Sequence, residues 1–397
     1  MKKIIFILSG VFLLNTSIAQ GKILSEKAHI SLITCSPGTD IYNTFGHSAV
    51  RVKDPVQDID VVFNYGTFSF GGSDLKDQLN FGIEFARGKL NYYLSTSKFE
   101  RFMKSYKKEN RSVFEQILNL TQEEKQYLFD LLVENYQPEN KYYKYDFFYD
   151  NCSSRIRDIV EKSLNNQLQF YGNDAVLHGK SGVTFMEKLE PYIAPSPWLR
   201  LGIYFLLGYP ANIDASLYHQ MFLPDYLMQG FESGTIYRNG TSEPLVSDFN
   251  TLFLREDVEM KTPFYMHPFF LFGVLALLVG GITYKNFKQE KHAFLIDYTV
   301  FLISGLLGIL LVLMWFATDH STTTWNFNLL WLLPTNFIAL FLLKKPFMKN
   351  YYIIAWLLIM IILIFWIWFP QKMNIAFLPL MAILVFRYLK LMALLKK

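Results

Sequence analysis

The chain is poor in residues that form cross-links or hold cofactors. Its 397 residues include only two cysteines, Cys35 and Cys152, so there is room for a single disulfide. In an oxidising compartment that disulfide is the structural alternative to a catalytic thiol. The sequence has no metal-ligand spacing and no phosphate-binding glycine loop, so it implies neither a metal nor another cofactor.

Strong charge of one sign is also missing. The net charge is only +4 and there is no long basic run, so nucleic-acid binding is not indicated. Hydrophobic residues make up 51% of the chain but are distributed unevenly. Residues 20–265 have the composition of a soluble mixed domain, whereas residues 266–397 are almost entirely apolar. The sequence therefore predicts two domains of different kinds.

The N-terminus is typical of a secretory signal. Lysines precede a short apolar core at residues 4–14, and small residues precede a cleavage position near Ala19. The apolar core is short for a membrane span, which favours a cleaved signal peptide, residues 1–19, over a retained anchor. The residue directly after the cleavage position is not a cysteine, so the mature protein is not expected to be a lipoprotein itself.

The apolar part contains five segments that are long enough, or nearly so, to cross a bilayer. Most of the Lys and Arg lie after the first and third segments and towards the C-terminus. The positive-inside rule therefore predicts a multi-pass inner-membrane protein with residues 20–265 in the periplasm and the C-terminus in the cytoplasm. The segments are residues 267–284, 294–317, 327–343, 351–369 and 373–394.

Polar residues interrupt the apolar part at two places. The predicted outward loop, residues 317–326, contains Asp319, His320 and Asn326, which either border a binding site or form an ordinary solvated loop. Inside the third segment, Pro334 and Asn336 either open a cavity in the bundle or kink it.

The stretch around Cys152 predicts the start of a helix. Asp150 or Asn151 is a suitable N-cap, and apolar residues then recur at helical spacing. Cys152 would lie in the first turn, where free N–H groups and the helix dipole favour a thiolate. Arg155 and Arg157 add positive charge nearby. An aromatic, strand-like run, residues 141–149, precedes the helix. A buried structural cysteine would give the same local pattern.

Upstream, the sequence predicts an antiparallel hairpin that contains His47. Residues 28–34, 47–52 and 60–65 have the pattern of strands. If the turn of the hairpin centres near residues 56–57, Asn64 lies diagonally across from His47 on the same face. A side-chain amide in that position orients an imidazole, as the third member of a Cys-His-Asn set does. Asp60 is the weaker alternative for this role.

The order of these residues in the chain, His47 before Cys152, is similar to that in a known family. The stretch from Phe45 to Ser48, the stretch from Asp150 to Cys152 and the C-terminal membrane bundle together resemble the Lnb-type lipoprotein N-acyltransferases. More distantly, His before Cys resembles the lecithin:retinol acyltransferase-like group. The resemblance implies an α+β fold, in which a permuted papain-like domain (antiparallel sheet plus helices) precedes an all-α five-span membrane domain. It implies Cys152 as nucleophile and His47 as base, and it leaves the role of Cys35 open.

The resemblance also implies the reaction. A phospholipid would donate an acyl chain to the thiol, and the resulting thioester would pass it to the α-amino group of a lipoprotein's lipidated N-terminal cysteine. N–H groups at the start of the Cys152 helix would stabilise the oxyanion. Two alternatives stay open: a membrane-tethered cysteine peptidase or amidase acting on cell-wall peptides, and a non-enzymatic scaffold stabilised by a disulfide.

Overall fold

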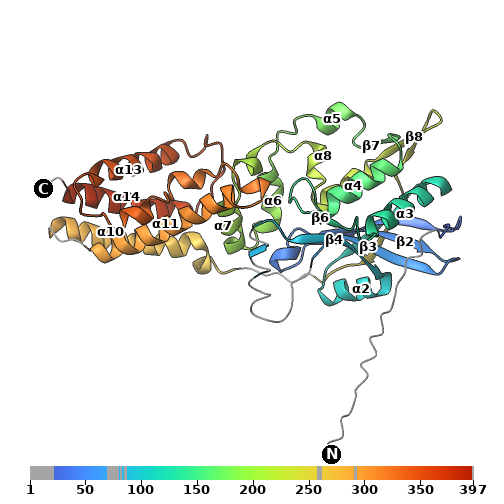
Figure 1. Ribbon diagram of the computed structural model, residues 1–397, viewed down its shortest axis with the longest axis horizontal. Coiled ribbons are helices and arrows are strands. Elements are labelled where there is room, and N and C mark those ends of the chain that lie inside the picture. The colour runs from blue at the N-terminus through green and yellow to red at the C-terminus, as the bar shows by residue number, and fades with distance from the viewer. Residues whose placement is uncertain are drawn as a thin grey trace, which may run out of the picture.

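A computed structural model describes residues 22–68, 80, 83–84, 87–256, 262–289 and 293–395. The predicted signal peptide lies outside the described residues. The molecule is elongated, with a sheet-containing domain at one end and a bundle of long helices at the other (Figure 1).

The first domain is built on a seven-stranded antiparallel sheet in the order β10-β5-β1-β2-β3-β4-β6. A second, three-stranded sheet has the order β7-β8-β9. The strands are β1 (His29–Cys35), β2 (His47–Asp54), β3 (Ile59–Thr67), β4 (Asn91–Lys98), β5 (Val113–Leu118), β6 (Tyr142–Lys144), β7 (Leu168–Gln169), β8 (Thr235–Arg238), β9 (Thr241–Pro244) and β10 (Val246–Phe253).

The predicted hairpin is confirmed. Strands β2 and β3 pair from Val50↔Phe63 to Asp54↔Ile59, which centres the turn between residues 56 and 57. Alternate residues of these strands face opposite sides of the sheet. Val50 and Phe63 pack with α3 (Gln122–Tyr136) and α4 (Cys152–Ser163), whereas Ala49 packs with α2 (Phe99–Lys108). Figure 1 shows α3 and α4 on one side of the sheet and α2 on the other.

The aromatic run before Cys152 is only partly a strand. Tyr142–Lys144 forms β6, but the chain then turns, with backbone hydrogen bonds in both directions between Asp146 and Asp150. The Asp146 carboxylate accepts hydrogen bonds from the N–H groups of Phe148 and Tyr149, 3.0 Å each. An Asp side chain that bonds to the following backbone favours a turn over a strand, so the prediction of a strand to residue 149 was wrong.

Three helices in the described part of the apolar region are long and apolar enough to cross a membrane: α10 (Pro268–Lys288), α11 (Phe294–Phe316) and α14 (Phe377–Leu394). A shorter apolar helix, α13 (Met348–Ile364), lies with them. The predicted third span, residues 327–343, is not one helix. It contains only the short pieces η5 (Phe327–Leu330) and α12 (Asn336–Ala339), because Pro334 lacks the N–H that helix continuation needs.

This broken segment is housed inside the bundle. The Asn336 side chain donates to Ser304 Oγ at 2.9 Å and accepts from the hydroxyls of Tyr351 and Tyr388 at 2.7 and 3.0 Å. Gly305 and Gly308 of α11 allow the segment to approach, since a Cβ at either position would lie within 2.4 Å of its backbone. Irregular backbone at membrane depth must be buried within the protein. Because both ends of the Asn336 side-chain amide are hydrogen-bonded, the structure favours a kink in this segment over a cavity.

Arg387 lies near the C-terminus but is a completely buried residue of α14. Its guanidinium makes two hydrogen bonds to the Asp297 carboxylate of α11, 2.7 and 2.8 Å, and one to the Thr283 hydroxyl of α10, 2.9 Å. A buried charge requires such partners in an apolar surrounding. Arg387 therefore ties three helices together.

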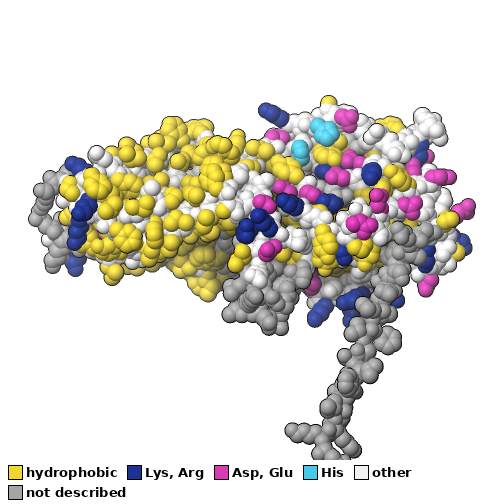
Figure 2. All heavy atoms as spheres, viewed as in Figure 1, with side chains coloured by type: hydrophobic (Ala, Val, Ile, Leu, Met, Phe, Trp, Pro, Cys, Tyr) yellow, Lys and Arg dark blue, Asp and Glu magenta, His cyan; other side chains and the backbone are white. Residues whose placement is uncertain are grey.

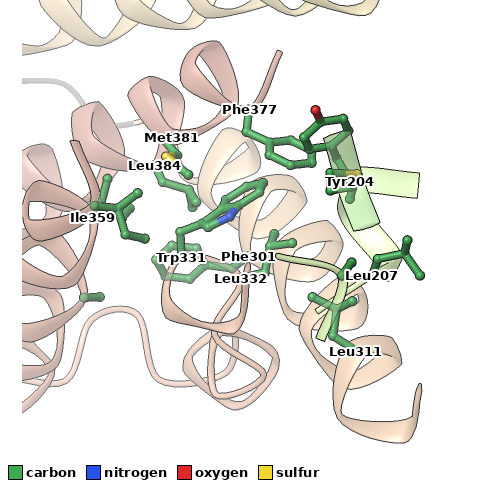
Figure 3. Close-up of a cluster of buried hydrophobic side chains, with 14 of the residues drawn as sticks. Tyr204, Leu207, Phe301, Leu311, Trp331, Leu332, Ile359, Phe377, Met381 and Leu384 are labelled. Atoms are coloured by element: carbon green, nitrogen blue, oxygen red, sulfur yellow. The ribbon is translucent and has the colours of Figure 1, made fainter. Parts of the chain in front are cut away.

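Short helices join the sheet domain to the bundle, and one hydrophobic core runs through the junction. Phe148 and Phe222 belong to the same buried cluster as Trp331 and Phe377 of the bundle. Figure 3 shows Tyr204 of α7 beside Phe377 and Trp331. The joining helices are α5 (Asp174–His178), α6 (Phe185–Ile193), α7 (Pro197–Leu206), η2 (Tyr209–Asn212), α8 (Leu217–Gln220) and α9 (Pro224–Glu232).

Candidate active site

Cys152 is the first residue of α4, as predicted, and Asn151 is the N-cap. The Asn151 Oδ1 atom accepts hydrogen bonds from the N–H groups of Ser153 and Ser154, at 2.8 and 3.1 Å. Its Nδ2 donates to the carbonyls of Phe147 and Phe222, at 2.8 and 2.9 Å. The cap thus fixes the turn that presents Cys152 to the sheet.

The thiol meets the sheet where β2 and β3 separate. The described β2–β3 pairing stops at Val50↔Phe63, and the Ser48 N–H points to the Cys152 sulfur. The hydroxyls of Ser48 and Ser153 hydrogen-bond at 3.0 Å, so helix and strand are joined beside the thiol. On the other strand, a Cβ at Gly66 would lie 3.5 Å from the Cys152 Cβ. Gly66 has φ +83°, a conformation that suits glycine.

Cys152 is not a stabilised thiolate. Burial raises its pKa, and the hydrogen bonds from Ser48 and Ser153 only partly offset that effect. The expected positive charge is neutralised, because Arg155 pairs with Asp150 at 2.6 Å and Arg157 with Asp158 at 2.6 Å. The prediction about Arg155 and Arg157 was therefore wrong, whereas N–H groups at the helix start do lower the pKa of the thiol, though by less than burial raises it.

His47 and Asn64 lie together, as the hairpin register requires. His47 Nε2 is 3.4 Å from Asn64 Oδ1, and the ring stacks on Tyr106 of α2 with centroids 6.4 Å apart. If Nε2 carries the proton donated to Asn64, Nδ1 keeps a lone pair for a base. Burial and the nearby Arg111 guanidinium lower the pKa of His47 to about 4, so the imidazole is neutral at pH 7.

The structure does not join His47 and Cys152 directly. Within the described residues the His47 ring makes its side-chain hydrogen bond to Asn64 and none to Cys152. The two are neighbours through Ser48, the residue after His47. Asp60, the weaker candidate for orienting His47, is instead paired with Arg51 at 2.7 Å.

Both cysteines are free thiols. Cys35 is completely buried and lies opposite His47 in the β1–β2 pairing. Burial raises its pKa, and its closest polar partner is the Tyr106 hydroxyl. The disulfide of the scaffold alternative is therefore not formed in this structure.

The loop at residues 317–326 docks on the chain that leads to Cys152. Ser321 Oγ donates to Asp146 Oδ2 at 2.5 Å, and the Asp319 N–H donates to the Arg87 carbonyl at 2.8 Å. The exposed Lys144 lies 3.6 Å from the Asp319 carboxylate. Asn326 is buried and donates to the carbonyls of Phe205 and Leu206 in α7, so it holds the junction together.

A cavity of about 670 Å³ lies at the opposite end of α4 from Cys152. Glu161, Asp174, His178 and Tyr218 are among its lining residues, and none of them contacts the thiol. No group of three His, Cys, Asp or Glu side chains placed to hold a metal occurs in the part of the chain that the structure describes.

Two protein-family models match this chain. The Lnb N-terminal periplasmic domain matches residues 16–180, and the Lnb transmembrane domain matches residues 259–397. The first match contains His47, Asn64 and Cys152, and the second contains α10, α11, α13 and α14. No curated protein and no solved structure matches the chain.

Proposed function

This chain belongs to the Lnb family, and we propose that it is a lipoprotein N-acyltransferase that uses Cys152 as nucleophile and His47 as base. The observation that carries the proposal is the position of the thiol. Cys152 begins a capped helix and lies against Ser48, directly after the histidine that Asn64 orients. Asn64 orients the base as the third member of a Cys-His-Asn set does. The mechanism also requires the His47 ring, which lies against Asn64 and Tyr106 in this structure, to come within hydrogen-bond reach of the thiol during the reaction.

In the first half of the reaction, neutral His47 removes the thiol proton as sulfur attacks a phospholipid ester carbonyl. The C–S bond forms, the tetrahedral intermediate collapses, and the imidazolium returns its proton to the departing lysophospholipid. In the second half, the α-amino group of a lipoprotein's lipidated cysteine attacks the thioester and releases the thiol. A raised thiol pKa and a lowered imidazole pKa suit this route, because both groups start neutral.

We also propose that the protein lies in the inner membrane with its sheet domain in the periplasm and its C-terminus in the cytoplasm. The name of the first matching family model supports the location of the sheet domain. On the face seen in Figure 2, the bundle is covered mostly by hydrophobic side chains, with Lys and Arg side chains at the end farthest from the sheet domain. Basic residues at that end favour the cytoplasmic side.

The main rival, a tethered cysteine peptidase, would use the same thiol and imidazole. It does not account for a buried core that joins the aromatic residues near Cys152 to the bundle, because a tether needs no such core. That continuity favours a lipid substrate, which reaches the thiol from the membrane.

The test is the mass of a lipoprotein from cells that produce the wild-type chain, Cys152→Ser or His47→Ala. We expect one additional acyl chain with the wild type only, with equal amounts of the three proteins in the membrane. The double variant should be no worse than either single one, since the residues act as a unit. Normal acylation by either single variant would contradict the assignment.

A further inference from the structure

The helix start offers fewer oxyanion donors than the sequence suggests. Asn151 Oδ1 already accepts hydrogen bonds from the N–H groups of Ser153 and Ser154. Of the first three N–H groups of α4, only that of Cys152 is therefore left to bind an oxyanion. The Ser48 N–H is directed at the sulfur itself. Oxyanion holes generally use two or more donors, so a further donor is needed beside the carbonyl that the sulfur attacks.

Tyr143 of β6 has the position and the free hydroxyl for this role. Its Oη lies 3.9 Å from the point where a Cβ on Gly66 would be, and the Cys152 Cβ lies 3.5 Å from that same point. The hydroxyl oxygen is buried and faces the Gly66 N–H, and no described residue accepts its proton. Leaving a buried polar group unpaired costs about 1–3 kcal/mol, so such a group calls for an explanation.

The ring of Tyr143 is held firmly, which keeps the hydroxyl in place. The Arg155 guanidinium lies 3.7 Å above the ring centroid, and that guanidinium is itself fixed by Asp150. Tyr65 packs against the ring edge-on, with centroids 6.4 Å apart. Burial also raises the pKa of Tyr143, so the hydroxyl keeps its proton at neutral pH and can donate.

We propose that Tyr143 is a catalytic residue whose hydroxyl donates a hydrogen bond to the oxyanion formed at Cys152. When sulfur bonds to the ester carbonyl carbon, the carbonyl π electrons move to oxygen, and the Tyr143 O–H and the Cys152 N–H stabilise that charge. The proton of Tyr143 is shared and not transferred. When the C–O bond to lysophospholipid breaks, the carbonyl re-forms and the hydroxyl is free again. The same donor serves when the amine attacks the thioester.

This inference rests on the proposed function and is tested on the full-length protein in detergent with Tyr143→Phe, which keeps the ring and removes the hydroxyl. Two rates are measured: thioester formation at Cys152 from phospholipid, by intact mass, and alkylation of Cys152 by iodoacetamide. Alkylation forms no oxyanion, so it reports thiol reactivity alone. We expect thioester formation to fall about 100-fold with alkylation unchanged.

The matched control is Tyr65→Phe, which removes a neighbouring hydroxyl that already bonds to the Asn135 side chain at 2.8 Å. It should leave the rate of thioester formation within about twofold of the wild type, because that hydroxyl is committed elsewhere. If Tyr143→Phe leaves both rates unchanged, or lowers both equally, the inference is overturned.

The variant Cys152→Ser distinguishes a failure of the proposed function from a failure of the role of Tyr143. Wild-type acyl transfer by Cys152→Ser overturns the proposed function. An inactive Cys152→Ser beside a fully active Tyr143→Phe overturns only the role of Tyr143.

Discussion

At the scale of single residues, the proposed chemistry depends on two groups that burial holds neutral. Desolvation penalises both the Cys152 thiolate and the His47 imidazolium, so the thiol and the imidazole are both neutral at rest. In papain-like ion pairs the thiolate is already formed at neutral pH. In the proposed mechanism the proton would move only when substrate is attacked, and the thiol would otherwise resist alkylation and oxidation.

This state has a pH signature. Alkylation of Cys152 should be slow at pH 6 and should rise about tenfold per pH unit to beyond pH 9, because only the thiolate reacts. Since the pKa of His47 is lowered to about 4, the base stays neutral through mildly acidic pH. The rate of thioester formation from phospholipid should therefore stay level from pH 8 to about pH 5.5 and fall only near pH 4. An alkylation plateau below pH 7, or a loss of activity centred near pH 6.5, would contradict the neutral pair.

At the scale of elements, the N-terminus of α4 is held by one side chain. Asn151 satisfies two N–H groups of the helix and two carbonyls from Phe147 and Phe222. The last of these carbonyls lies 71 residues away in sequence, so the cap also joins α4 to the short helices at the junction. Loss of the cap should therefore disturb both stability and the position of Cys152.

The prediction for this element is a marked loss of stability in Asn151→Ala. Removal of a helix cap costs about 1 kcal/mol, and unpaired buried carbonyls add about 1–3 kcal/mol. The control is Asn173→Ala, which removes the exposed cap of α5, a single hydrogen bond of 2.7 Å to the Val176 N–H. Thermal unfolding of the two purified variants should show the larger decrease in Tm for Asn151→Ala. Equal decreases would show that the buried contacts of Asn151 contribute little.

At the scale of the whole molecule, the bundle and the sheet domain form one unit. They share a buried hydrophobic cluster, and the loop at residues 317–326 is hydrogen-bonded to the chain that enters the Cys152 turn. Asp146 stands at the centre of this contact, because one carboxylate oxygen holds the turn and the other accepts from Ser321. The membrane domain thus helps to position the turn that leads to Cys152.

Removing this contact should impair catalysis without changing the thiol. In Ser321→Ala the Asp146 carboxylate loses its partner from the membrane domain, and we expect kcat/KM for acylation to fall on the order of tenfold through misplacement of the turn. Iodoacetamide alkylation of Cys152 should be unchanged. The control is Thr318→Ala in the same loop, whose hydroxyl donates to the Met314 carbonyl at the end of its own helix. Similar losses in both variants would show that the loop matters only for folding.

The orientation of the bundle is a second prediction at this scale. A green fluorescent protein fused after Lys397 should be fluorescent, and alkaline phosphatase at the same position should be inactive, because both results indicate a cytoplasmic C-terminus. The opposite pair of results would refute the proposed topology. The C-terminus is the suitable fusion point, since the loop at residues 317–326 is packed against the sheet domain.

Local sequence patterns were sufficient for several features of this protein. Alternating residues predicted the hairpin of β2 and β3 and its register, which places Asn64 beside His47. Asn151 was one of two predicted caps for α4. These features depend on neighbours within a few residues or on a short turn, so the information is in the sequence itself.

Only the tertiary structure decided the other features, because those features depend on contacts between segments that are distant in the sequence. The state of the Cys152 thiol follows from burial and from the pairing of Arg155 and Arg157 with aspartates. Strand β10 pairs with β5 across more than a hundred residues, and its sequence had no clear strand signal. The apolar composition of residues 327–343 suggested a span, yet Pro334 and the close approach to two glycines of α11 make it a buried broken segment. The free Tyr143 hydroxyl beside Cys152 is likewise visible only once β6, Gly66 and α4 are brought together.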